Sequence, residues 1–283
     1  MPRRAVLAGV SLGLDAPVAV MGAVNVSPES FHAGSVHVER DDLVAAALAM
    51  VDAGAALIDV GARSTAPYGT SSISDEEERQ RLARAVEALA AKVPVPISAD
   101  TARPRPARAA LDAGARVIND VSGLSDPEMA ALVRDRGAGA ILMALPSDAP
   151  SRLSPIATVK TLLGDALERA RAAGVEDEQV VLDPGIGFFR GERIGWAEWD
   201  AAVLASLGEL LALGRPLCIG VSRKSFLGAI IDRPRTEDRL AGSLAATAVA
   251  VWNGASLIRT HDVAETLDAV RIAERIRRAG GTL

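Results

Sequence analysis

The sequence is poor in aromatic residues, in cysteine and in basic charge, and each deficit argues against a class of function. Aromatic residues make up 3% of the 283 residues, which argues against a platform that stacks single-stranded nucleic acid. The formal net charge is −5, so we expect no nucleic-acid partner. The single cysteine, Cys218, excludes a disulfide framework within one chain, and we therefore expect a cytoplasmic protein.

Long apolar runs are missing as well. None reaches the length of a membrane span, so we expect no membrane partner. A basic pair near the start is followed by an apolar stretch, but Gly9, Ser11 and Gly13 interrupt it, which argues against a secretory signal. We expect a short N-terminal hairpin there, closing the floor of the fold. Cys218 lies in an apolar run and is expected to be a small buried side chain rather than a nucleophile.

The sequence does contain a regular alternation of short apolar runs and longer helical patterns. Eight β-type runs begin near Val18, Ala56, Pro96, Val117, Gly139, Val180, Pro216 and Ala255. Helical patterns cover residues 42–53, 75–92, 104–113, 126–136, 156–173, 197–213, 239–253 and 263–279. Without a linker, this alternation predicts an α/β fold, a (β/α)8 TIM barrel that fills residues 1–283 as a single domain. An open doubly wound sheet is the alternative, but its Gly-x-Gly-x-x-Gly fingerprint is absent after the first strand.

Polar side chains stand where several of these apolar runs end. In a barrel of parallel strands, ligands bind at that face. Asp100 and Asp183 each end a run, and Asn119 and Lys224 follow two others. Together they could hold a flat heterocycle, because carboxylates suit guanidine-like edges and lysine suits a ring carbonyl. Any one carboxylate could instead cap the next helix or pair with a neighbour.

Further cations occur at the same predicted face. The segment GVSRKSFLG follows the seventh run, and we interpret its Arg223 and Lys224 as a clamp for an anion or for electron-rich heteroatoms. The alternative is a solvated loop. Arg259, His261 and Asn25 could form a second, cationic pocket for phosphates. The sequence contains no ligand spacing typical of structural zinc and no recognisable Ser-His-Asp set.

Seven stretches at these strand ends resemble the dihydropteroate synthase family. They read MGAVNVSPESF from Met21, IDVG from Ile58, ISADT from Ile97, VIND from Val117, LDPGIGF from Leu182, SRKSFLG from Ser222 and RTHD from Arg259. The resemblance covers about Val18 to Val263 in chain order. It implies a transferase that joins 6-hydroxymethyl-7,8-dihydropterin diphosphate to p-aminobenzoate, releasing pyrophosphate, in folate biosynthesis.

The resemblance also implies roles for single residues. The pterin would be held by Asp100, Asn119, Met143, Asp183 and Lys224. The arylamine and the pyrophosphate would meet Thr65, Arg63, Ser225, Arg259 and His261. Lys224, Arg259 and His261 would be the catalytic side chains, and Asn25 would bind the cofactor Mg²⁺. The expected partners are the two small-molecule substrates and a second copy of the chain, and the acceptor site would be a sulfonamide target.

The sequence departs from the family pattern on the side of the second substrate. Arg63 stands where the family usually has glutamate, and Ala66 where it usually has an arginine that shapes this side of the site. Ala144 replaces the usual histidine after the fifth strand, and Glu29 replaces an aspartate. Arg63 could compensate for the missing arginine, or it could pair with an acid such as Asp59 or Glu29.

Three other functions remain open at this point. The same transfer could use a different acceptor, such as the ribosylated aminobenzene of methanopterin-type pathways, because Ala66 and Tyr68 change the acceptor loop. The chain could also be a pterin-binding methyltransferase barrel that serves a corrinoid protein, which the NVSPES and SRKS motifs disfavour. It could finally be a partner subunit that binds pterin without catalysis, although Asn25, Lys224 and Arg259 argue against complete loss of function.

Overall fold

The chain forms a (β/α)8 barrel, as its sequence predicts. A computed structural model describes residues 4–27, 40–63, 73–145, 153–190 and 194–280. Parallel strands pair in the order β8-β7-β6-β5-β4-β3-β10-β9, and a bridge between Leu182 and Leu217 joins the two edges. The strands are β3 (Ala19–Asn25), β4 (Leu57–Gly61), β5 (Ile97–Asp100), β6 (Val117–Asp120), β7 (Gly139–Met143), β8 (Val180–Asp183), β9 (Cys218–Gly220) and β10 (Leu257–Thr260).

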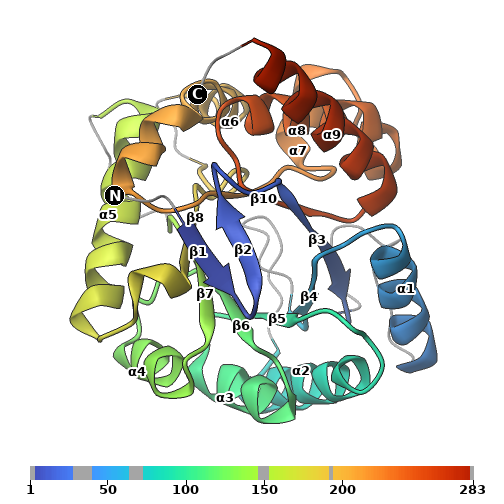
Figure 1. Cartoon of the computed structure of the whole chain (residues 1–283), viewed down its shortest axis with the longest axis vertical. Helices are drawn as coiled ribbons and strands as arrows, with labels where there is room; N and C mark the ends of the chain where they lie inside the picture. The colour runs from blue at the N-terminus through green and yellow to red at the C-terminus, as the bar shows by residue number, and fades with distance from the viewer. Residues whose placement is uncertain (1–3, 28–39, 64–72, 146–152, 191–193, 281–283) are drawn as a thin grey trace.

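Helices alternate with the strands and form the outer ring in Figure 1. They are α1 (Arg40–Asp52), α2 (Asp75–Ala90), α3 (Pro104–Ala113), α4 (Pro127–Arg136), α5 (Pro155–Ala172), α6 (Trp196–Ala205), α7 (Ser225–Ile230), α8 (Leu240–Trp252) and α9 (Val263–Ala279). Segments of 3₁₀ helix are η2 (Asp177–Gln179), η3 (Leu207–Leu213) and η4 (Thr236–Arg239). The predicted helix 197–213 is thus split into α6 and η3. Helices α7 and η4, which both follow β9, were not predicted from the sequence.

Local signals account for where several helices begin and end. Ser74 and Ser154 precede α2 and α5, and each side chain accepts a hydrogen bond from a backbone N–H in the first turn. Gly114 and Gly137 follow α3 and α4 with φ of 118° and 57°, the left-handed conformation that glycine adopts without strain. Every residue of β4 and β7 is buried, which explains why the strands read as apolar runs without alternation.

A two-stranded hairpin closes one end of the barrel, as predicted. Strands β1 (Arg4–Leu7) and β2 (Val10–Gly13) pair in antiparallel fashion and lie across the centre of the helix ring in Figure 1. Leu7 and Leu12 are fully buried in a cluster with the strand residues Met21, Leu57, Val117, Ile141, Val181, Cys218 and Leu257. Several of these residues begin their strands, so the hairpin covers the amino-terminal end of the barrel.

The single cysteine belongs to the same buried cluster. Cys218 is buried, and burial raises the pKa of its thiol well above the ordinary value, so the prediction of a small buried side chain is confirmed. Among the helices within the described ranges, none combines the length and the apolar character needed to cross a bilayer. With the amino-terminal end closed, the strand ends opposite the hairpin are left to build a site.

Candidate active site

Neighbouring strands place three of the predicted residues in one row with a glycine. In the strand register, Gly61 of β4 lies opposite Asn25 of β3 and Asp100 of β5, and Asp100 in turn lies opposite Asn119 of β6. A Cβ atom at Gly61 would lie 3.0 Å from Asn25 Oδ1 and 3.8 Å from Asp100 Oδ2. The absence of a side chain at Gly61 therefore leaves room for these two oxygens to approach each other.

The guanidinium of Arg259 links this row of residues to the other side of the barrel. Its Nε donates to Asp59 Oδ2 at 2.6 Å, and its Nη2 donates to Asp100 Oδ2 at 3.1 Å. Asn119 Nδ2 also donates to Asp59 Oδ2, at 3.2 Å. The sequence predicted a pterin pocket and a separate phosphate pocket, whereas the structure joins Arg259 directly to Asp100. Asp59, which is fully buried, is the shared acceptor that sequence reasoning did not assign to Arg259.

Burial and neighbouring charges shift the pKa values of two groups in this network. Burial raises the pKa of Asp100 to about 7, and the charges of Asp59 and Glu78 act in the same direction, against the opposing effect of Arg259. Asp59 and Asp100 raise the pKa of Arg259 despite its burial, so the guanidinium stays charged. Oδ1 of Asp59 and Oδ1 of Asp100 are buried, with no hydrogen-bond partner in the described ranges. Such oxygens can accept N–H groups from a ligand.

Strand pairing brings Asp183, the last residue of β8, beside Met143, the last residue of β7. The two residues are opposite each other in the β7–β8 register. Gly185 donates its N–H to Asp183 Oδ1 at 2.8 Å, and its φ of 71° turns the loop back over the strand ends. A Cβ atom at Gly185 would lie 3.3 Å from Met143 Cγ, so the loop packs closely on that thioether side chain. A carboxylate and an apolar surface are thus adjacent at this corner.

Lys224 lies between that loop and Arg259. Its Nζ donates to the carbonyl of Ile186. A Cβ atom at Gly187 would lie 3.6 Å from Lys224 Nζ, and one at Gly220 would lie 4.0 Å from Nζ and 3.8 Å from Arg259 Cβ. The two glycines therefore let the ammonium approach both the β8 loop and the end of β9.

A further carboxylate, on α6, is bound to the loop that Lys224 contacts. Asp200 of α6 is 1% exposed, and its Oδ1 accepts the N–H of Gly187 at 2.9 Å. Burial raises the pKa of Asp200 to about 6. It also raises the pKa of Asp183 and lowers that of Lys224. The attraction between the Lys224 ammonium and the two carboxylates acts against all three pKa shifts. Asp200 was not predicted from the sequence, although an acid beyond Glu198 in the otherwise apolar segment WAEWDAAVLA was an available signal.

The predicted clamp of two cations is wrong for Arg223. This residue has a left-handed φ of 53°, and its Nε and Nη2 donate to the carboxylate of Asp262 at 2.9 and 2.7 Å. Its backbone N–H donates to Ser243 Oγ at 2.8 Å. The reversed backbone at Arg223 separates the directions of the two cations, and only Lys224 joins the site.

His261 and Ser225 each contact a polar side chain, Ser222 and Arg190 respectively. His261 Nδ1 is 2.9 Å from Ser222 Oγ, which also accepts the backbone N–H of His261 at 3.2 Å. Ser225 Oγ accepts from Arg190 Nη2 at 2.9 Å. Arg190 was not predicted from the sequence, although it comes two residues after the motif LDPGIGF.

Arg63 contacts an acid other than Asp59, while Glu29, the other acid expected, lies outside the described ranges. The Nε of Arg63 lies 3.4 Å from Glu78 Oε2. Glu78 of α2 is 1% exposed and also accepts from Thr101 Oγ1 at 2.6 Å and from Arg103 Nη1 at 2.9 Å. Asp59 is instead bound to Arg259. Glu78 was not predicted, and the acidic first turn of the helix that follows the loop was the only signal for it.

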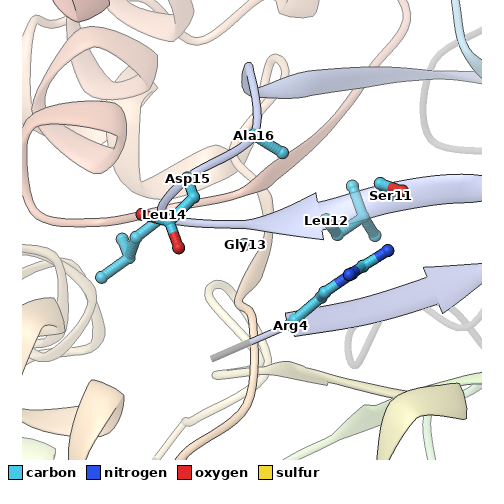
Figure 2. Close-up of a pocket in the computed structure, with 7 residues that line it drawn as sticks. All are labelled: Arg4, Ser11, Leu12, Gly13, Leu14, Asp15 and Ala16. Carbon is cyan, nitrogen blue, oxygen red and sulfur yellow. The ribbon is translucent and has the colours of Figure 1, made fainter. Parts of the chain in front are cut away.

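Several predicted residues lie outside the described ranges. They are Glu29, Thr65, Ala66 and Tyr68, so the acceptor loop and Thr65 remain predictions. A hollow of about 280 Å³ occurs elsewhere, along Arg4 and residues 11–16 (Figure 2). It lies at the hairpin, the closed end of the barrel, and contains none of the residues at the strand ends.

Comparison with known proteins agrees with this geometry. The model of the family described as "Pterin binding enzyme" matches residues 21–261. Dihydropteroate synthase from Escherichia coli (strain K12) is 39% identical over 272 residues, covering 94% of each chain. The structure of Xanthomonas albilineans dihydropteroate synthase with 4-aminobenzoic acid matches with a TM-score of 0.86 and 38% identity, covering 98% of this chain and 99% of that one.

A second solved structure, of a dihydropteroate synthase from Coxiella burnetii in complex with pteroic acid, also has a TM-score of 0.86. It is 34% identical and covers 98% of this chain and 99% of that one. These matches extend over nearly the whole barrel and include every strand end that carries a site residue. The chain therefore belongs to the dihydropteroate synthase family of pterin-binding enzymes.

Proposed function

We propose that this chain condenses 6-hydroxymethyl-7,8-dihydropterin diphosphate with p-aminobenzoate and releases pyrophosphate, as a step of folate biosynthesis. The observation that carries the proposal is the convergence of Asp100, Asn119, Asp183 and Lys224 at the open end of the barrel. Two carboxylates, an amide and an ammonium complement a flat heterocycle that has both N–H donors and a ring carbonyl. Family membership supports the same reaction.

In this proposal the pterin is bound by the corner around Asp183. Its carboxylate would accept hydrogen bonds from the guanidine-like edge of the ring, and Lys224 would donate to the ring carbonyl. Asp100 and Asn119 would contact the remaining ring nitrogens, and Met143 would pack on the ring face. The contact between Gly185 and Asp183 supports this role, because it fixes the carboxylate before the substrate arrives.

The diphosphate would extend from the ring toward Arg259 and His261. The amine nitrogen of the acceptor forms a bond to the exocyclic methylene carbon while the bond from that carbon to the pyrophosphate oxygen breaks. The amine then loses a proton, and the negative charge leaves on pyrophosphate. A dissociative path, through a pterin cation, would depend on cations at the leaving group, and Arg259 keeps its charge in the buried site.

Magnesium is the cofactor that we propose for this leaving group. In the described part of the chain, no group of three or more His, Cys, Asp or Glu side chains could hold a metal ion. Sparse coordination suits magnesium, which keeps several waters and shares substrate phosphates. Asn25 Oδ1 fits this role, since it occupies the space that a side chain at Gly61 would fill. Bound magnesium would neutralise charge on the departing pyrophosphate.

In this proposal, the part of the site that binds the arylamine acceptor is formed by Ser225, Thr65 and Arg63. Arg63 would contact pyrophosphate, and the length of its contact with Glu78, 3.4 Å, supports a side chain that can turn toward an anion. A site for p-aminobenzoate would also be a sulfonamide target.

We further propose that residues 1–283 form one domain and that the protein is cytoplasmic, which a single buried cysteine supports.

We also propose that the protein is a homodimer. Val249 and Trp252 of α8 are 46% and 47% exposed, and Ile272 and Ile276 of α9 are 63% and 55% exposed. The hydrogen bond from Arg277 of α9 to the Val251 carbonyl of α8, at 2.7 Å, places the ends of these helices side by side. Helix α8 contains no charged residue, so a second copy of this apolar face is a suitable partner.

Replacing Asp183 with asparagine should weaken pterin binding by roughly one to two orders of magnitude. The change keeps the shape but removes the charge-assisted hydrogen bond, which contributes about 1.5–3 kcal/mol. Calorimetry with the pterin substrate measures the effect. Asp268→Asn is the control, because the Asp268 side chain on α9 is 81% exposed. Unchanged affinity in Asp183→Asn would remove Asp183 from the pterin site.

Removal of divalent metal should abolish turnover, and added Mg²⁺ should restore it. Asn25→Ala should raise the Mg²⁺ concentration needed for half-maximal rate, because the one protein oxygen proposed as a ligand is gone. The measurement is pyrophosphate release in metal-depleted buffer with increasing Mg²⁺. Full turnover in excess chelator, with metal content verified as negligible, would refute the metal role.

Arg63→Ala should lower turnover by roughly two or more orders of magnitude with the fold intact. The reason is loss of a cation at the developing pyrophosphate. Steady-state rates and circular dichroism give the two readouts. Arg79→Ala is the matched control, since Arg79 pairs with Glu76 on the outside of α2. Undiminished turnover would show that Arg259 and His261 handle pyrophosphate without Arg63.

Trp252→Glu should convert a dimer into a monomer in light-scattering measurements. A charge at this position would be desolvated in the proposed interface of α8 and α9. Ile230→Glu serves as the control, because Ile230 is 57% exposed at the end of α7, outside that face. A monomeric parent protein, or a dimer that tolerates Trp252→Glu, would contradict the proposal.

A further inference from the structure

One peptide group in the loop after β8 lies between an acid and a base. Its carbonyl, which belongs to Ile186, accepts a hydrogen bond from Lys224 Nζ. Its N–H, which belongs to Gly187, donates to Asp200 Oδ1 at 2.9 Å. Because the C=O and the N–H of a trans peptide point in opposite directions, the ammonium and the carboxylate bind this group from opposite sides. The two charges are therefore joined by a continuous path of hydrogen bonds.

The residues of this loop allow the lysine to approach the peptide closely. Gly187 has a φ of 87°, a left-handed conformation that favours glycine. A Cβ atom there would lie 2.9 Å from Lys224 Cδ, which is too close for a side chain. Lys224 Nζ also lies 5.1 Å from the centroid of the Phe188 ring, within range of a cation–π contact. Residues 186–188 thus form the surface on which the ammonium is held.

Asp200, on the far side of that peptide, is deeply buried for a carboxylate. It is 1% exposed, and its Oδ2 is buried with no hydrogen-bond partner in the part of the chain that the structure describes. A buried charge is costly unless hydrogen bonds or opposite charges compensate for it. Burial raises the pKa of Asp200 to about 6, and the Gly187 N–H and the charges of Lys224 and Arg190 act against that rise. At neutral pH the carboxylate is therefore mostly ionised.

The carboxylate in turn affects the lysine. Burial lowers the pKa of Lys224, and Arg259 on β10 acts in the same direction. Asp183 on β8, Asp200 on α6 and the Cys218 thiol on β9 act against that decrease. Hydrogen bonds in a chain polarise one another, so a carboxylate at the N–H strengthens the bond that the carbonyl accepts from the ammonium. The arrangement therefore favours a charged lysine in a fixed position.

We propose that Asp200 is a positioning residue that keeps Lys224 charged and directed at the pterin, acting through the peptide group between Ile186 and Gly187. The inference rests on the function proposed above, in which Lys224 donates to the ring carbonyl of the pterin. Asp200 itself does not touch the substrate. Loss of its charge weakens pterin binding because a neutral amine is a weaker donor than an ammonium.

The first test uses Asp200→Asn. Asparagine keeps the shape of the side chain and an oxygen that can accept the Gly187 N–H, but it has no charge. Affinity for the pterin substrate is measured by calorimetry from neutral to alkaline pH. Glu198→Gln is the matched control, because Glu198 is an exposed acid in the first turn of the same helix. Titration of the pterin itself is common to all the proteins compared.

At neutral pH, Asp200→Asn should bind the pterin substrate roughly three- to tenfold more weakly than the parent. The difference should grow at alkaline pH, because Lys224 gives up its proton at a lower pH in the variant. A residue that only supports the loop would not produce this pH dependence, since asparagine can make the same hydrogen bond. The control should follow the parent at every pH.

The second test leaves Asp200 unchanged and observes the amide proton of Gly187 by NMR. In the parent its resonance should titrate with the carboxylate that it contacts, with an apparent pKa of about 6. In Lys224→Met the transition should move to higher pH, because the ammonium that favours the ionised carboxylate is gone. The transition should be absent in Asp200→Asn, which separates it from the titration of Asp183 nearby.

Two results would overturn the inference while leaving the proposed function intact. One is a loss of pterin affinity in Asp200→Asn that is absent or does not depend on pH. The other is a Gly187 transition that occurs at the same pH in Lys224→Met as in the parent, which would show that the two charges are not coupled. A parent protein that does not bind the pterin substrate would overturn the proposed function itself, and with it this inference.

Discussion

The structure of this site depends on one mostly buried cation, with a side chain that is 20% exposed, held between two carboxylates. Arg259 reaches from β10 to Asp59 on β4 and Asp100 on β5, with Asp59 fully buried. Removing one partner of such a group leaves an uncompensated charge, at a cost of about 3–5 kcal/mol. The network therefore fixes the relative position of three strand ends, and it leaves buried carboxylate oxygens for a ligand.

The residues at the ends of β8 and β9 are positioned relative to the Arg259 network. Lys224 is held next to Arg259 by glycines at 187 and 220, and Asp200 anchors the loop that contains Gly187. Two like charges, Lys224 and Arg259, would repel each other without acids nearby. Asp183 and Asp200 offset that repulsion, and the resulting alternation of acids and bases suits a substrate with a polar ring and a diphosphate.

Much of the fold could be predicted because parallel strands in a barrel are buried on both faces and are followed by strong turn signals. Asp100, Asn119, Asp183 and Lys224 were identifiable for the same reason, as polar residues where apolar runs end. The hydrogen-bond and ion-pair partners of the site residues could not be predicted, because they depend on strand register.

Asp59 and Arg259, for example, are 200 residues apart in sequence. The opposite roles of Arg223 and Lys224 were also out of reach, since they follow from a left-handed backbone conformation at Arg223. Glu78 and Asp200 support the site from helices behind it, where an acid in the sequence is hard to tell from an ordinary surface charge.

The central claim is that this barrel transfers the pterin group to p-aminobenzoate. The most direct measurement is pyrophosphate release from 6-hydroxymethyl-7,8-dihydropterin diphosphate with Mg²⁺, with a panel of arylamines supplied in turn. The account predicts release that requires p-aminobenzoate and yields one dihydropteroate for each pyrophosphate. Tight pterin binding without release for any arylamine, or release only with a ribosylated aminobenzene, would contradict it.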